Sequence, residues 1–133
     1  MKPKFLSIKD LTQAREEFSR INVHPAGIEI MALKSIYRLI KFESVDPKTA
    51  NIIKQEMLAR GGDAAVAKTV GMFQEKKTDM ILMGNLAQYL RLVCKLRKQT
   101  FGDCQKIGNS LQELLFSEFG VALDLSAQLQ QEF

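Results

Sequence analysis

Few side chains in this sequence could carry out catalysis. His24 is its one histidine, and Cys94 and Cys104 are its two cysteines. The spacing of the cysteines fits neither a common zinc motif nor a CxxC redox pair. Pairing either thiol with His24 as a base would require a tertiary contact, and Cys94 is expected to pack as a small hydrophobic side chain within a helix. The carboxylates are scattered, so the sequence predicts no catalytic residue, no metal site and no cofactor.

Two glycine-containing turns remain as places where a ligand could approach the backbone. Gly61-Gly62 lies at the predicted carboxyl end of a helix, where the helix dipole repels phosphate, and neither a GxGxxG nor a GxxxxGK[ST] motif is present. A simple turn is therefore favoured there. Gly84-Asn85 has the opposite arrangement, since a predicted strand ends and a helix begins at this point. Open α/β sheets often bind anions at such junctions.

A basic helix face follows this junction. Arg91, Lys95 and Lys98 recur at helical spacing, so they could together contact an anionic ligand, nucleic acid or an acidic protein surface. Aromatic residues do not alternate with them as they do in surfaces that bind single strands, so nucleic acid is not expected. The candidate ligand-binding residues are thus Gly84, Asn85, Arg91, Lys95 and Lys98. A turn and a solvated helix face are the alternative interpretation.

Size and composition indicate one ordinary globular domain. The 133 residues are 46% hydrophobic and 26% charged, well away from disordered sequences. We expect a single domain over residues 1–133, with 121–133 as a weakly ordered or packing tail. The chain is too short for a (β/α)₈ barrel, which needs about 250 residues. The net charge of +4 conceals an acidic end, because residues 107–133 contain neither Lys nor Arg.

Neither a signal peptide nor a membrane span is expected. Residues 1–9 form no continuous apolar segment, and the longest apolar runs fall far below the roughly 20 residues that cross a bilayer. Two cysteines are too few for a disulfide framework. These features favour a cytoplasmic protein.

Helical segments alternate with short strand candidates along the chain. The best-marked helix is capped by Asp46, has Pro47 in its first turn and ends at Gly61. Other helices are expected to begin at Asp10, Asn85 and Gln105. Strands are expected at 36–42, 63–70 and 78–83, with a strand or coil at 5–8, a turn at 22–27 and an ambiguous segment at 28–35.

The order of these segments predicts an α/β (or α+β) domain in which helices pack in layers on a small sheet. Segment 36–42 is expected to be a buried strand. The last helix is expected to turn Ile107, Leu111, Leu114 and Leu115 toward the core. The order of the strands in the sheet stays open.

Three stretches, taken in this order, resemble the segment that precedes the catalytic barrel in some bacterial and archaeal dihydropteroate synthases. They are Gly27–Ser35, Lys54–Val66 and Thr78–Tyr89. The resemblance extends over about residues 27–102, and the sequence after Gly102 departs from the pattern.

Dihydropteroate synthases join a pterin pyrophosphate to p-aminobenzoate on a TIM barrel, which holds their pterin- and phosphate-binding residues. None of those residues can be assigned here, because no barrel motif occurs. The resemblance therefore implies an accessory or N-terminal domain that is not catalytic by itself, with a pterin-binding TIM barrel as its partner in cis or in trans. The alternative is a free-standing module that binds a small anionic ligand at Gly84-Asn85 and the basic helix face. A homodimer, whose interface could also complete an enzyme site, remains open.

Overall fold

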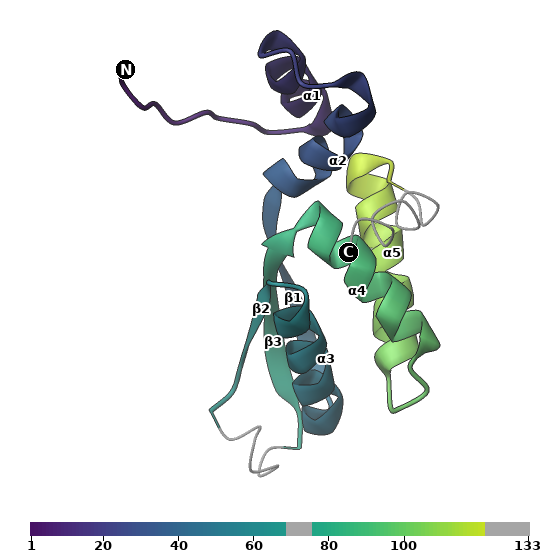
Figure 1. The fold of residues 1–133 in the computed structure, drawn as a ribbon. Helices are drawn as coiled ribbons and strands as arrows, with labels where there is room; N and C mark the ends of the chain where they lie inside the picture. Colours follow the sequence, from purple (N-terminus) through teal and green to yellow (C-terminus); the bar gives the residue numbers. More distant parts are fainter. Residues whose placement is uncertain (69–75, 122–133) are drawn as a thin grey trace.

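The computed structural model describes residues 1–68 and 76–121 (Figure 1). Its elements follow one another as α1 (Leu11–Arg20), α2 (Pro25–Ser35), β1 (Tyr37–Val45), α3 (Pro47–Ala59), β2 (Asp63–Val66), β3 (Thr78–Asn85), α4 (Leu86–Lys98) and α5 (Cys104–Phe119). None of the helices in these two ranges is long and apolar enough to cross a membrane. The predicted tail lies outside the described residues except for Val121, which is buried.

The three strands form one antiparallel sheet in the order β1-β3-β2. The last strand in the sequence is therefore the central one. Leu39 of β1 and Asp63 of β2 both lie opposite Met83 of β3, and Lys41 and Ala65 both lie opposite Ile81. The predicted class, a small sheet with helices packed on it, is confirmed, and the antiparallel strands make α+β the better description.

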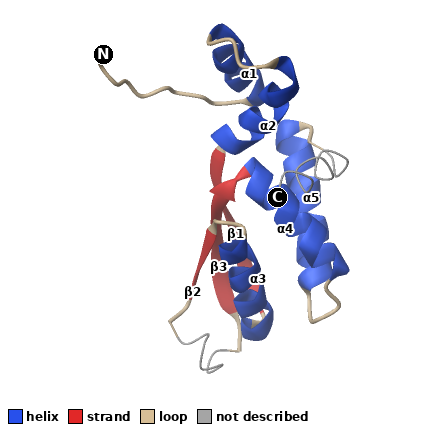
Figure 2. Ribbon diagram, viewed as in Figure 1, coloured by secondary structure: helices blue, strands red, loops and turns tan. Residues whose placement is uncertain are grey.

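Helices cover one face of the sheet. Figure 2 shows α3 and α4 on the same side of the three strands. Ile40, Ala64, Met80 and Leu82 point to that side and are buried against the helices, as the period of two along a strand requires.

The opposite side of the sheet is termed the outer sheet face. Its apolar part consists of Tyr37, Leu39, Ile81 and Met83, which alternate with the buried positions along β1 and β3. Tyr37 and Leu39 are 56% and 63% exposed. The predicted buried strand at 36–42 is therefore wrong in its burial, because β1 is an edge strand that has helices on one face only.

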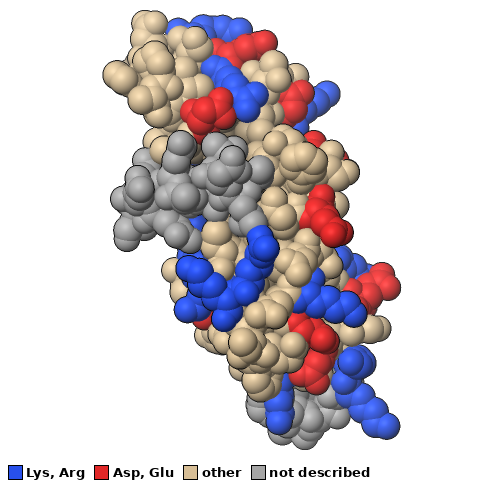
Figure 3. Space-filling view, turned by 90° about the vertical axis from the view of Figure 1, so that its right-hand side faces the viewer, with Lys and Arg blue, Asp and Glu red and all other residues tan. Residues whose placement is uncertain are grey.

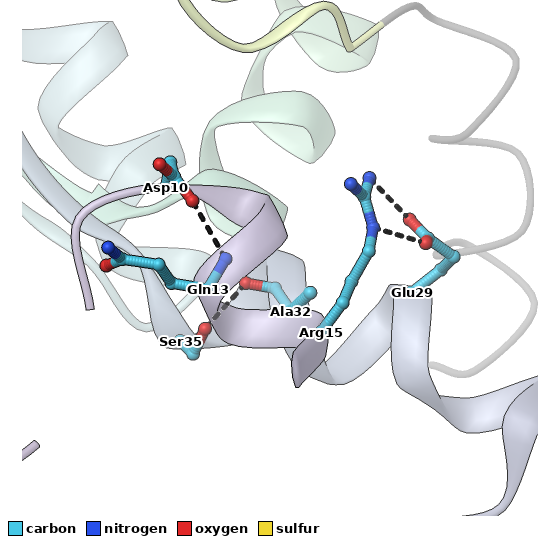
Figure 4. A network of polar contacts seen from close by, with 6 residues as sticks. All are labelled: Asp10, Gln13, Arg15, Glu29, Ala32 and Ser35. Atoms are coloured by element: carbon cyan, nitrogen blue, oxygen red, sulfur yellow. Dashed lines mark hydrogen bonds and ion pairs between the residues drawn. The ribbon is translucent and has the colours of Figure 1, made fainter. Parts of the chain in front are cut away.

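A short α1–α2 hairpin precedes the sheet. Asp10 caps α1 by accepting a hydrogen bond from the Gln13 amide at 2.8 Å. Arg15 of α1 meets Glu29 of α2 through two hydrogen bonds, Nε to Oε1 at 2.6 Å and Nη2 to Oε2 at 3.2 Å (Figure 4). Both side chains are nearly half exposed, so this pair contributes less to stability than a buried pair would.

The predicted turn at 22–27 is wrong in its second half. The chain turns at Ile21 and Asn22, but α2 begins at Pro25. The Nδ1 of His24 accepts a hydrogen bond from the Ala26 amide at 3.2 Å, and Pro25 occupies the first helical turn, where its missing N–H is not needed. The same helix resolves the ambiguous segment 28–35.

Residues 5–8 are coil, one of the two alternatives predicted for them. Two smaller expectations changed. Leu114 is 42% exposed, whereas Ile107, Leu111 and Leu115 are buried as predicted. Gly84 does not turn the chain, because it belongs to β3, which continues to Asn85.

Candidate functional site

The Gly84-Asn85 junction is closed by hydrogen bonds within the chain. Asn85 and Gln88 form a capping box. The backbone N–H of Gln88 donates to the side-chain Oδ1 of Asn85 at 2.8 Å, and the backbone N–H of Asn85 donates to the side-chain Oε1 of Gln88 at 2.9 Å. The Leu86 amide donates to the carbonyl of Ile36 at 3.0 Å. Three of the N–H groups that could have held an anion at this helix start already have partners.

Gly84 lies close against two side chains. A β-carbon at this position would lie 2.3 Å from Met57 Cε and 2.9 Å from Gln88 Oε1. Gly62 also has no room for a side chain, since a β-carbon there would lie 2.6 Å from the Met83 carbonyl oxygen and 2.7 Å from Met57 Cε. These close approaches explain both glycines without a ligand.

The Gly61-Gly62 turn and Gly84 of β3 meet around the buried side chain of Met57. Gln88 Nε2 donates a hydrogen bond to the carbonyl of Arg60 at 3.2 Å, which ties the start of α4 to the end of α3. Gly61, at φ 87°, ends α3 in the left-handed region, as a glycine stop requires. We call Met57, Gly61, Gly62, Gly84 and Gln88 the glycine cluster. It joins the Lys54–Val66 and Thr78–Tyr89 stretches into one packed unit.

The hydroxyl group of Tyr89 lies next to this cluster. It donates a 2.6 Å hydrogen bond to the carbonyl of Arg38, and the backbone of Gly84 also hydrogen-bonds it. Arg38 and Gly84 are opposite one another in the β1–β3 register, so the hydroxyl bridges the two strands. Burial raises the pKa of Tyr89, with a smaller contribution from Tyr37.

The structure does not gather the five candidate ligand-binding residues into one site. Lys95 and Lys98 are exposed on α4 and Arg91 is half-buried. At 1.5 Å per residue, Lys95 lies roughly 15 Å along the helix from Asn85. Figure 3, which looks onto the α4–α5 side of the molecule, shows one group of Lys and Arg side chains near its centre, with other Lys and Arg side chains and carboxylates scattered over the same face. A ligand site formed by the junction and this face together stays a prediction.

The residues with nucleophilic or basic potential are also dispersed. His24 caps α2, whereas Cys104 begins α5 at the end remote from α2 (Figure 1). Burial, and to a lesser degree Asp103 and Glu56, raises the pKa of the Cys104 thiol, so its thiolate form is suppressed. Within residues 1–68 and 76–121, no three His, Cys, Asp or Glu side chains are placed to hold a metal ion.

A hollow of about 200 Å³ lies between β1 and the end of α5. Arg38 lines it, with its guanidinium 5.3 Å from the centre of the Phe119 ring and a 3.0 Å hydrogen bond from Nη2 to the carbonyl of Lys9. Ligand pockets commonly measure about 300–1,000 Å³, so this hollow is small for a pterin. The residues that line it are Arg38, Leu39, Ile40, Leu114, Leu115, Glu118 and Phe119.

The chain is similar to a folate-pathway protein of Halobacterium salinarum, described as a probable bifunctional folylpolyglutamate synthase/dihydropteroate synthase. The two are 31% identical over 108 residues, which is 81% of this chain and 13% of the relative. The chain therefore spans a small part of that bifunctional protein. No protein-family profile matches the chain, and no solved structure matches it.

Proposed function

We propose that this chain is an accessory domain of a dihydropteroate synthase-type enzyme and has no catalytic activity by itself. The observation that carries the proposal is the similarity of 81% of the chain to only 13% of a bifunctional enzyme of the folate pathway. A match that covers most of one chain and a small part of a longer one is typical of a single domain within a larger enzyme.

The glycine cluster supports the same proposal. Two of the three stretches that resemble dihydropteroate synthases pack around Met57, and the glycines there are explained by close contacts with side chains and backbone. A shared sequence pattern of this kind preserves a fold rather than a reaction centre. A partner domain would then supply the chemistry, and this chain would bind or stabilise that partner.

Co-expression of the chain with the dihydropteroate synthase of the same organism tests the proposal. We expect the two to co-purify, and we expect the purified chain alone not to condense a pterin pyrophosphate with p-aminobenzoate. Turnover by the chain alone, abolished by a substitution in the chain, would show that it is an enzyme. Failure to bind the synthase would contradict the accessory role.

The arrangement in cis has its own test. Deleting the matching segment from the Halobacterium salinarum relative should lower the thermal stability or the dihydropteroate synthase activity of that protein. A deletion variant with unchanged activity and melting temperature would argue against a role beside the synthase.

A further inference from the structure

We propose that the outer sheet face is the surface on which the dihydropteroate synthase partner docks. This inference rests on the accessory role proposed above and adds to it the place of contact and the chemistry of the partner surface. The partner would present an apolar patch with a basic border.

The first argument is the apolar character of the face. Leu39 lies directly opposite Met83 on the neighbouring strand, and Ile81 precedes Met83 by two positions in β3, so the three side chains adjoin on one side of the sheet. With Tyr37 they expose on the order of 300 Å², a size at which an exposed apolar patch is often an interaction site. The helices of the described chain pack on the other face (Figure 2).

The second argument is that the apolar surface continues around the edge of the sheet. Leu39 lines both the outer sheet face and the hollow between β1 and α5, where Leu114 is 42% exposed. β1 is a nine-residue edge strand with one strand neighbour. Exposed apolar edge strands invite association unless another surface covers them.

The third argument is the charge at the border of the patch. Glu43, Asp63 and Asp79 carry side chains that are 74%, 53% and 58% exposed. Glu43 and Asp79 lie 4.0 Å and 3.9 Å from the Nζ of Lys41, and Asp63 lies 3.9 Å from the Nζ of Lys54, so three carboxylates face two lysines. Asp79 belongs to β3, which also carries Ile81 and Met83, and Asp63 of β2 lies opposite Met83. The excess of one carboxylate over these two lysines favours a partner with Lys or Arg at the matching position.

The fourth argument is the size of the relative. The matching segment makes up 13% of one longer polypeptide in Halobacterium salinarum, so in that protein other parts of the same chain are held close to it. A second copy of the chain is not needed to cover the face, because a linked domain has a high effective concentration.

Binding measurements with matched variants test the inference. Tyr37→Thr/Leu39→Thr removes the exposed apolar groups of β1 and retains residues that favour strands. The control, Ile21→Gln/Phe116→Gln, removes two equally exposed apolar side chains, 71% and 59% exposed, that lie outside the sheet. The full chain and both variants are titrated against the dihydropteroate synthase of the same organism, with circular dichroism as a check of folding.

We expect the Tyr37→Thr/Leu39→Thr variant to bind about tenfold or more weakly and the control to bind like the wild type. Equal binding by both variants would overturn the docking surface and leave the accessory role intact. A wild-type chain that does not bind the synthase would overturn both proposals. A wild-type chain that instead forms a dimer, which the Tyr37→Thr/Leu39→Thr substitutions dissociate, would assign the face to a second copy of the chain.

Discussion

Met57 is the residue around which the glycine cluster is organised. Its side chain is fully buried and would meet a β-carbon at either Gly62 or Gly84. Two glycines separated by more than twenty residues therefore serve one contact, in which α3, β2 and β3 approach closely. Interiors packed at this density do not accept an added methyl group without moving a neighbour.

Gly84→Ala should lower the free energy of unfolding by about 1–3 kcal/mol, because the new methyl group would displace Met57 or Gln88. Gly27→Ala is the matched control, since its β-carbon would find its nearest neighbour, Val23 Cγ1, at 4.0 Å within a helix. That control should be neutral or stabilise the protein by up to about 1 kcal/mol. Chemical denaturation measures both, and equal effects of the two substitutions would contradict the packing role of Gly84.

Tyr89→Phe should cost about 1–2 kcal/mol, because the carbonyl of Arg38 would lose its buried hydrogen bond. The substitution should also change the pH dependence of stability. The folded protein keeps the Tyr89 proton to higher pH than the unfolded chain does, so the wild type should lose stability as the pH rises above about 10. The variant should lose less over the same range. Parallel pH profiles from urea titrations would contradict this account of Tyr89.

At the scale of the elements, capping residues and turns were the most readable part of the sequence. Asp46 with Pro47 and Asn85 with Gln88 act locally, within one turn of helix, so the sequence around each is sufficient to predict it. The start of α2 was missed because Pro25 fits both a turn and the first turn of a helix. The burial of β1 was missed because an edge position depends on strand order, which the sequence around β1 does not encode.

Asn85→Ala should destabilise the protein by about 1 kcal/mol through loss of the capping box, and Asn85→Asp should retain most of the stability, since aspartate also caps helices. Asn109→Ala, at an exposed position in α5, is the control and should leave the free energy of unfolding unchanged.

The Asn85→Asp variant also separates the two functions considered for the Gly84-Asn85 junction, a helix cap and an anion-binding site. An anion-binding site would lose its ligand when a carboxylate is introduced there, and a phosphate or pterin titration that changes between wild type and Asn85→Asp would support such a site.

At the scale of the whole molecule, α1 packs against fewer elements than α4 and buries fewer residues. α1 buries only Leu11 and Ala14 and packs mainly against α2, at one end of the molecule (Figure 1). α4 lies between α5, α2, α3 and the sheet and carries the longest set of buried residues, Leu86, Ala87, Tyr89, Leu90, Leu92, Val93 and Leu96. The candidate site shows a related limit of prediction: Gly61, Gly62 and Gly84 could be singled out from the sequence, but their contact through Met57 and Gln88 depends on tertiary packing.

The amides of α1 should exchange with deuterium well before those of α4, because local opening of α1 exposes little apolar surface. Hydrogen exchange followed by mass spectrometry of peptic fragments measures the difference. Equal protection of the two helices would show that α1 is part of the cooperative core.

The position of β3 at the centre of the sheet determines when the sheet can form as the chain is synthesised. β1 and β2 leave the ribosome before β3, yet they do not pair with each other in the sheet. Every hydrogen bond between strands therefore waits for residues 78–85, and until then Ile40 and Ala64 lack the strand against which they are finally buried. A nascent chain that ends at Lys77 should contain helices but no sheet, and translation of the next eight residues completes both strand pairings in a single step.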